Sequence, residues 1–329
     1  MTLSMPSPGS GAVPGPWQEP VRGGHPDPRH LALTGAEQLR AMLAGDAPVP
    51  PMGRLTGTRL IDAAPGAATF ELPLSAWLCG PDGHPSSGVL TLPADAAMAC
   101  AIMTGLPPHL GLTTTELTLR QVRPAPLNGR LLARARVIHP EAPLALADVS
   151  LRDEAGTLIA HGGSSCFIMG GGPPEQSPPF PETTGSPDPW QRGAPAWEPG
   201  DDAPPPLERL TGLHPVMAHD GEATYALPAT GWLCAPPPGR VQGGAVAMLA
   251  EAAMTAAART STPSGTAFRP VELKLNYLRP LAADGREAYA HARVVNAGRR
   301  FVVAGAEVRD ADERLIAVAS GSVMAADER

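Results

Sequence analysis

The chain has 329 residues, a formal net charge of −7 at pH 7 and a pI near 5.7. This length predicts about two domains, and the acidic balance argues against nucleic acid as a partner, because nucleic-acid-binding proteins usually carry a basic surface. No run of about 18 apolar residues is present to span a bilayer, and residues 1–19 lack the basic start of a signal peptide. We therefore expect a cytoplasmic protein with no membrane partner.

The first 30 residues are crowded with Pro, Gly and Ser and lack periodicity, so we expect residues 1–30 to be a disordered tail. Thr34 and Glu37 then fit a capping box, which predicts a short helix ending near Ala44. Residues 170–206 hold three consecutive glycines and a proline run, typical of a semi-rigid linker. For Trp190 in this linker, docking on a domain and plain exposure are both open.

Two halves of the chain repeat the same sequence signals. The clearest repeats are Arg-Leu-Thr-Gly at 54–57 and 209–212 and Trp-Leu-Cys at 77–79 and 232–234. These spacings are 155 residues, and single-residue slips later raise the spacing to 156 and then 157. A unit of roughly 120 residues is the size of a whole domain. The chain therefore reads as a fused dimer, with one domain at 31–169 and a second at 207–325.

Each repeat carries one long Ala- and Met-rich segment and several strand-like runs. Residues 271–277 alternate apolar and polar side chains, which indicates a strand with one wet face. Residues 287–295, 301–309 and 315–324 follow as further strands, and their short connections favour antiparallel order. The sequence predicts an α+β fold with one long helix and an antiparallel sheet in each repeat.

The long segment of the second repeat carries the candidate chemistry. Residues 245–258 are apolar nearly all round, which indicates a buried helix, and Glu251 is its one charged group. Burying a carboxylate is costly unless it is hydrogen-bonded or its pKa shifts. Thr255 lies on the same helical face, one turn later. Gln242, Gly243 and Gly244 begin the helix, where free N–H groups suit a developing oxyanion. These are parts for acyl transfer to water.

A Gly-Gly helix start with an acidic residue eight positions on, followed by a strand ending in Asn-Tyr-Leu-Arg-Pro, resembles the hotdog-fold acyl-CoA thioesterases of the PaaI-like and 4-hydroxybenzoyl-CoA type. The resemblance is good over 245–324 and weaker over 34–169. It implies a tandem double hotdog, in which each long helix is wrapped by a curved antiparallel sheet. It also implies hydrolysis of an acyl-CoA thioester without a further cofactor.

The same resemblance assigns the oxyanion glycine to Gly243, the acidic residue to Glu251 and a helping threonine to Thr255. Many members carry histidine before the two glycines. This chain has Gln242 there, and its side-chain amide can still donate a hydrogen bond.

The reactive groups of one helix cannot act together, because Gly243 and Glu251 lie about 12 Å apart along the helix axis. A working site therefore combines the helix start of one repeat with the carboxylate of the other. The first composite site comprises Gln242, Gly243, Gly244, Asp95 and Thr114, and the second comprises Ser86, Ser87, Gly88, Glu251 and Thr255.

Each composite site has a sequence defect. Pro93 lies inside the first repeat's helix, where proline removes a hydrogen bond and bends the chain, so the donor at Ser87 should be disturbed. Ala99 replaces the equivalent of Thr255, so Asp95 lacks that hydroxyl. We favour the first site, because misplacing one oxyanion donor costs about 10²-fold or more in rate.

Other residues carry weaker signals. The four cysteines form no metal or redox motif and are read as packing residues, and the nine histidines show no metal-ligand spacing. Arg299 and Arg300 are candidates for contact with the phosphates of CoA, although a solvated position is more common for charges at a turn.

Alternative functions remain at this point. One is an acyl-CoA sensor that binds without turnover, and another is a hotdog enoyl-CoA hydratase, for which Asp82-Gly83-His84 is too short a motif. An acyl-carrier protein in place of CoA and a homodimer of such chains are also open.

Overall fold

The computed structural model describes residues 15–170 and 186–325, except residue 237 and residues 263–267. Residues 1–14 of the predicted tail and 171–185 of the predicted linker lie outside this part of the chain. In the described residues, no helix combines the length and the apolar character needed to cross a membrane.

The first unit begins with two short helices and continues into six strands and a long helix. Its elements are α1 (Gly35–Ala44), α2 (Pro51–Thr56), β1 (Arg59–Ala64), β2 (Ala67–Leu74), η3 (Ala76–Leu78), α3 (Ser87–Met103), β3 (Leu110–Gln121), β4 (Gly129–His139), β5 (Leu144–Arg152) and β6 (Leu158–Gly170). The predicted capping box of α1 is confirmed, because the Thr34 N–H donates to Glu37 Oε2 at 2.8 Å and the Glu37 N–H donates to Thr34 Oγ1 at 3.3 Å.

The second unit repeats this order from its first short helix onward. Its elements are α4 (Pro206–Thr211), β7 (His214–His219), β8 (Glu222–Pro228), η5 (Gly231–Leu233), α5 (Gly243–Thr260), β9 (Phe268–Tyr277), β10 (Glu287–Ala297), β11 (Phe301–Arg309) and β12 (Leu315–Ala325). The predicted helix and the predicted late strands are confirmed. The strands β1 and β7 and the helices α2 and α4 were not predicted.

Both units contribute to one antiparallel sheet of 12 strands, ordered β1-β2-β4-β5-β6-β3-β9-β12-β11-β10-β8-β7. The units meet where β3 pairs with β9, and Thr118 lies opposite Lys274 there. These two residues are equivalent repeat positions, so a pseudo-twofold axis passes between them, as in an isologous dimer. An ion pair of 2.7 Å joins Arg120 to Glu272 across the seam. The fused-dimer prediction therefore describes the arrangement of the sheet.

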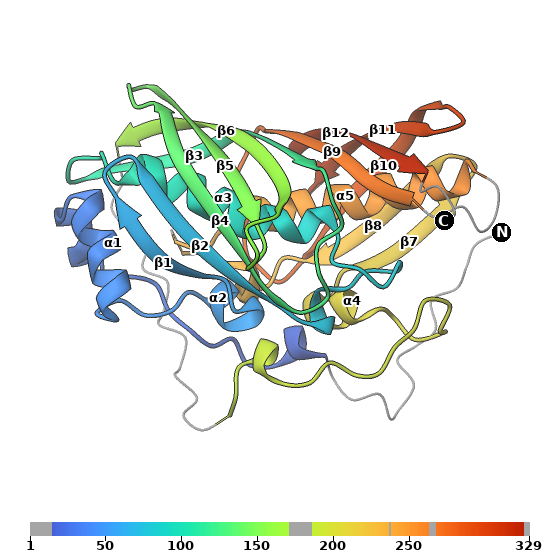
Figure 1. Cartoon of the computed structure of the whole chain (residues 1–329), viewed down its shortest axis with the longest axis horizontal. Coiled ribbons are helices and arrows are strands. Elements are labelled where there is room, and N and C mark those ends of the chain that lie inside the picture. Colours follow the sequence, from blue (N-terminus) through green and yellow to red (C-terminus); the bar gives the residue numbers. More distant parts are fainter. Residues whose placement is uncertain (1–14, 171–185, 237, 263–267, 326–329) are drawn as a thin grey trace.

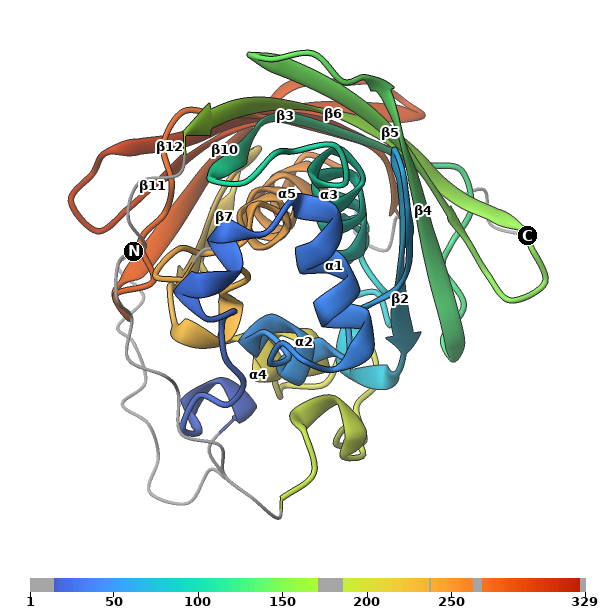
Figure 2. The same cartoon turned by 90° about the vertical axis from the view of Figure 1, so that its left-hand side faces the viewer.

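The helices α3 and α5 lie side by side on the concave face of the curved sheet (Figures 1 and 2). Their contact needs glycine, since a Cβ on Gly244 would lie 2.8 Å from the Thr91 carbonyl oxygen and a Cβ on Gly88 would lie 2.7 Å from Met248 Cα. Glycine at Gly88 and Gly244 therefore lets the backbone of the partner helix approach closely.

Residues 15–30 differ from the predicted disordered tail. They include η1 (Pro16–Gln18), and η2 (Pro28–Ala32) begins there. The Trp232 Nε1 donates to the Glu19 carbonyl oxygen at 2.9 Å, and the buried Arg22 guanidinium lies 5.8 Å from the Trp232 ring. Composition did not predict that residues 15–30 are ordered, because Trp232, which holds them, belongs to a distant part of the chain.

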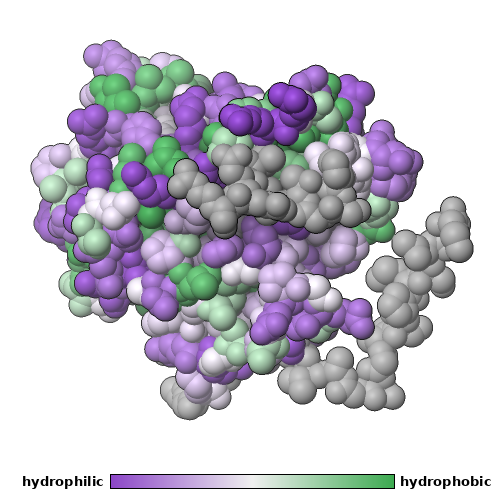
Figure 3. Space-filling view, turned by 45° about the vertical axis from the view of Figure 1, so that its right-hand side comes forward, coloured by the Kyte–Doolittle hydropathy of each residue, from purple (hydrophilic) through white to green (hydrophobic). Residues whose placement is uncertain are grey.

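The linker forms an equivalent contact with the first unit. Its η4 (Pro189–Gln191) lies against α2, and Trp190 packs on Gly57, so docking is the outcome for this tryptophan. The Trp77 Nε1 donates to the Arg192 carbonyl oxygen at 2.7 Å. An ion pair of 2.7 Å between Arg192 and Glu19 joins the linker to the N-terminal segment. On the face shown in Figure 3, hydrophilic residues surround smaller hydrophobic groups.

Candidate active site

Glu251 lies on α5 with its side chain between the two units. It is 5 % exposed, and Thr255 Oγ1 donates to its Oε1 at 2.7 Å. The start of α3 in the other unit lies beside this carboxylate, since a Cβ on Gly88 would lie 3.1 Å from Glu251 Oε2. Burial raises the pKa of Glu251, and the nearby charge of Asp82 raises it further, whereas the Thr255 hydroxyl, Arg259 and the Gly88 N–H oppose the shift. The structure thus joins a carboxylate and a helix start from different repeats.

Asp95 has the pseudo-symmetric position on α3. It is 6 % exposed, Thr114 Oγ1 from β3 donates to its Oδ1 at 2.8 Å, and the Gly244 N–H donates to its Oδ2 at 3.3 Å. Burial raises the pKa of Asp95, and these two hydrogen bonds lower it. Each carboxylate therefore accepts one threonine hydroxyl and lies beside the helix start of the opposing unit, and Asp95 also accepts an N–H from that helix start.

The surroundings of Asp95 contain a tyrosine that sequence reasoning did not single out. The Tyr277 hydroxyl donates to the Gly243 carbonyl oxygen at 2.8 Å, and burial raises the pKa of this hydroxyl well above its usual value. A Cβ on Gly243 would lie 2.9 Å from Asp95 Oδ2 and 3.3 Å from the Tyr277 hydroxyl oxygen. Gln242 Nε2 donates to the Leu92 carbonyl oxygen at 3.0 Å. Side chains of the protein therefore surround this helix start closely.

The start of α3 is arranged differently from the start of α5. Ser86 Oγ caps α3 by accepting the Val89 N–H at 3.3 Å. Ser87 stands at the repeat position of Gly243, and its buried hydroxyl has no hydrogen-bond partner among the described residues. The helix runs on through Pro93 to Met103. The disturbed donor at Ser87 stays a prediction.

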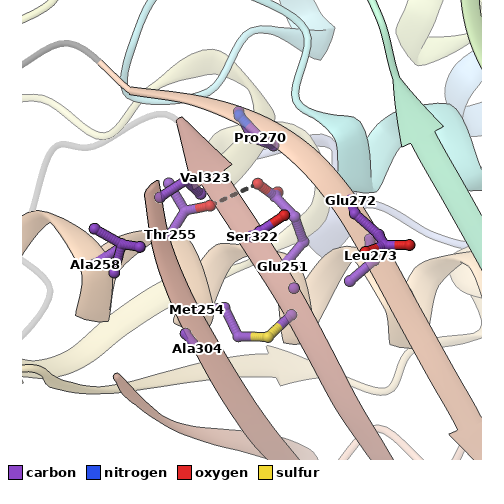
Figure 4. Close-up of a pocket in the computed structure, with 12 residues that line it drawn as sticks. Glu251, Met254, Thr255, Ala258, Pro270, Glu272, Leu273, Ala304, Ser322 and Val323 are labelled. Carbon is purple, nitrogen blue, oxygen red and sulfur yellow. Dashed lines mark hydrogen bonds between the residues drawn. The ribbon is translucent and has the colours of Figure 1, made fainter. Parts of the chain in front are cut away.

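Two cavities border Glu251 and Thr255. The smaller one, shown in Figure 4, encloses about 250 Å³ including space open to solvent, and it lies between α5 and the strands β9, β11 and β12. The larger one encloses about 530 Å³ on the same measure, and it lies between α5, α4, β8 and the loop at residues 80–86 of the first unit. Three residues line both cavities, namely Glu251, Thr255 and Pro270. The two cavities therefore adjoin at Glu251.

The larger cavity brings together groups that the sequence gave no reason to connect. Its polar residues are Asp82, Ser86, Glu208, Tyr225, Glu251, Thr255 and Arg259. Its apolar wall includes Leu207, Leu213 and Met248. The repeat itself could have pointed to Glu208. Each repeat has a proline two residues before this position, and the second repeat has Glu208 where the first has Gly53.

The remaining candidates lie elsewhere or are inert. Arg299 and Arg300 are exposed between β10 and β11 and are not among the residues that line the two cavities, so their contact with CoA stays a prediction. All four cysteines are free thiols, and burial raises the pKa of each to about 11 or 12. Within the described residues, no group of His, Cys, Asp and Glu is arranged to hold a metal ion.

The comparisons with known proteins bear on the fold and on the second unit. Residues 238–317 match the model of the thioesterase superfamily. The tesB protein of Mycobacterium avium subsp. paratuberculosis is similar in structure with a TM-score of 0.59 and 12 % identity, over 86 % of this chain and 98 % of that one. An acyl-CoA thioesterase II from Mycobacterium marinum gives a TM-score of 0.55 and 11 % identity, over 84 % and 98 %.

A conserved hotdog-fold protein from Alicyclobacillus acidocaldarius gives a TM-score of 0.54 and 14 % identity, over 85 % of this chain and 100 % of that one. A search of curated protein sequences gives no match. The chain therefore has the double-hotdog fold, and the predicted resemblance to hotdog-fold thioesterases is confirmed.

Proposed function

From the double-hotdog fold and the thioesterase-superfamily match in the second unit, we propose that this protein hydrolyses an acyl-CoA or acyl-carrier-protein thioester at Glu251. The observation that carries the proposal is that two cavities meet at the Glu251 carboxylate and its Thr255 partner. Sequence reasoning favoured the Asp95 site. The preference moves to Glu251 because Tyr277 and Gln242 crowd the helix start that faces Asp95.

The resting hydrogen bonds suggest how substrate engages the site. The thioester carbonyl oxygen accepts the Gly88 N–H, which lies beside Glu251 Oε2 and then stabilises the oxyanion. This oxygen of Glu251 faces the thioester carbon, while Thr255 holds the other oxygen. The buried Ser87 hydroxyl supplies a second donor near the same helix start.

Glu251 then acts on the thioester carbon directly or through water. As a nucleophile it forms a mixed anhydride and expels the thiolate, and water hydrolyses the anhydride. As a general base it takes a proton from the attacking water, and collapse of the tetrahedral intermediate expels the thiolate. Label in the enzyme's carboxylate after single-turnover hydrolysis in ¹⁸O-water would indicate the nucleophilic route, because solvent oxygen reaches Glu251 only when water attacks the Glu251 carbonyl of the anhydride.

The direct test measures thiol release from a panel of acyl-CoA thioesters by the wild type, Glu251→Gln and Asp95→Asn. We expect Glu251→Gln to lose roughly 10²- to 10⁴-fold in kcat, and Asp95→Asn to stay within about threefold, since it keeps the shape of the side chain. Circular dichroism and thermal unfolding check that both variants fold. Undiminished rates in Glu251→Gln, or loss confined to Asp95→Asn, would overturn the assignment. Binding of acyl-CoA by the wild type without thiol release would favour the sensing role.

A further inference from the structure

The larger cavity contains a second buried carboxyl group in addition to Glu251. Glu208 lies on the short helix α4, is 8 % exposed and borders the cavity. Its side chain has no hydrogen bond or ion pair with the described residues. Glu208 is not among the described residues with a fully buried unpaired polar atom, so its carboxyl oxygens keep some exposure at the cavity. A largely buried carboxyl group without a partner is unfavourable for folding, and a donor in the cavity would relieve this cost.

The repeat shows that the fold itself does not need this carboxyl group. The equivalent helix α2 has Gly53 at the same position, where a Cβ would lie 2.8 Å from the Thr58 carbonyl oxygen. Both helices otherwise keep the same design, with the Thr56 and Thr211 hydroxyls each donating at 2.8 Å to the carbonyl oxygen four residues earlier. Both end at a glycine in the left-handed conformation. Of the two units, only the second therefore has a carboxyl group at this position, beside the cavity at Glu251.

The charges around the larger cavity indicate which part of the substrate enters it. Asp82, Glu208 and Glu251 border it, with Arg259 as the single cationic residue in its lining. Phosphate groups of a CoA molecule would be repelled by this carboxyl set. The apolar wall of Leu207, Leu213 and Met248 instead suits an acyl group.

We propose that Glu208 is a specificity-determining residue, whose carboxyl group accepts a hydrogen bond from a hydroxyl or ammonium group on the acyl chain, beyond the thioester. This inference rests on the proposed thioesterase function. It assigns substrates whose acyl group carries a hydrogen-bond donor, in preference to the parent acyl groups without one. Tyr225, which also borders the cavity, is positioned to contact the same end of the acyl group.

The raised pKa of Glu208 and two general effects of hydrogen bonding agree with this role. Burial raises its pKa to about 7, so the carboxylate is readily formed near neutral pH when a donor approaches. A hydrogen bond to a charged group contributes roughly 10- to 100-fold in affinity. A buried acceptor that stays unpaired also penalises the analogue that lacks the donor.

The test compares matched acyl-CoA sets, each with a parent acyl group, its hydroxylated form and its amino form. For the wild type we expect at least a tenfold higher kcat/KM for one donor-bearing form than for the parent. Glu208→Gly copies the first repeat, and we expect the ratio to fall close to one, mainly through the donor-bearing substrate. Glu208→Gln keeps an acceptor oxygen and should retain part of the preference. The hydroxyl and amino forms show whether the carboxyl group selects a neutral or a cationic donor.

A matched control is Glu222→Gln, which removes an exposed carboxylate from β8, the strand that carries Tyr225. We expect this variant to keep the full preference. A wild type that hydrolyses thioesters with equal kcat/KM for parent and donor-bearing forms, or a preference that survives undiminished in Glu208→Gly, would overturn the inference and leave the proposed function standing. A wild type that releases no thiol from any substrate would overturn the proposed function, and this inference with it.

Discussion

The two composite sites of this molecule have the same backbone plan but different surroundings. At each, a buried carboxylate accepts one threonine hydroxyl and lies beside the helix start of the opposing unit. At Asp95 the adjacent strand supplies Tyr277, whose hydroxyl donates to the Gly243 carbonyl oxygen, whereas the equivalent residue of the first unit is Gln121, whose amide donates to the Arg123 carbonyl oxygen. The two sites therefore differ in the side chains around them, and the two cavities described above border the Glu251 site.

The largest effect is expected at Gly88 and Gly244, the glycines at which α3 and α5 touch. Gly244→Ala and Gly88→Ala should each destabilise the protein by about 3 kcal/mol, because the added methyl group meets backbone of the partner helix. Urea unfolding measures this loss. Gly111→Ala is the control, since no atom lies within 4 Å of a Cβ at that position. Equal stability of Gly88→Ala and the wild type would show that the helices do not pack as described.

A second effect concerns Glu208, which only the second unit has. The pKa is about 7 in the folded protein against a usual value of 4.5, so the folded state binds this proton more tightly than the unfolded state. The group therefore favours folding below pH 4.5, and this contribution is lost as pH rises toward 7, by up to about 3 kcal/mol. Asp82, Tyr225, Glu251 and Arg259 share its cavity.

Unfolding of the wild type and Glu208→Gln across this pH range measures the difference. We expect Glu208→Gln to gain stability relative to the wild type between pH 4.5 and 7, with a constant difference above that range. A difference that does not vary with pH would show that the carboxyl group titrates normally.

The two threonines sharpen the comparison of the sites. Thr255→Ala should lower kcat by about tenfold, as expected for loss of one hydrogen bond to a charged group. The hydroxyl favours the ionised form of Glu251, so its removal raises the pKa of Glu251 and moves the acid limb of kcat/KM to higher pH. Thr255→Ser should restore both properties. Thr114→Ala, the matched change at Asp95, should leave the acid limb in place, and a shift there would transfer the chemistry to Asp95.

The smallest effect is expected at Tyr277. Tyr277→Phe removes the hydrogen bond to Gly243 beside Asp95. A single neutral hydrogen bond contributes about 1 kcal/mol to stability. Because this bond lies away from Glu251, we expect kcat/KM to change by less than about threefold. Steady-state kinetics on the thioester panel checks this. A loss of tenfold or more would place the active site at the Asp95 end.

Much of the fold followed from local patterns in the sequence. The repeat, the Thr34 capping box, the buried helix around Glu251 and the late strands depend on periodicity and spacing, which a single chain displays directly. The short strands β1 and β7 were missed because few of their residues are buried. The order of residues 15–30 was missed because Trp232, which anchors Glu19, lies more than 200 residues away along the chain.

The residues of the two composite sites were predictable, but the choice between the two sites was not. The spacing of about 12 Å between Gly243 and Glu251 required that each site combine residues of both repeats. The hydrogen bond from the Gly244 N–H to Asp95 joins the two repeats in this way. Pro93 does not end the helix, because a helix held between a sheet and a second helix continues through a proline, and the disturbed donor at Ser87 stays a prediction.

The sequence by itself determined that two copies of one unit are joined, that each buries an acidic residue in a long apolar helix, and that a helix start faces each acid only across the pair. The tertiary structure decided which acid borders open space, because that depends on Tyr277, Gln242 and Glu208, side chains that meet the site from other elements. Packing between distant segments sets cavity shape, and no local pattern along the chain encodes it.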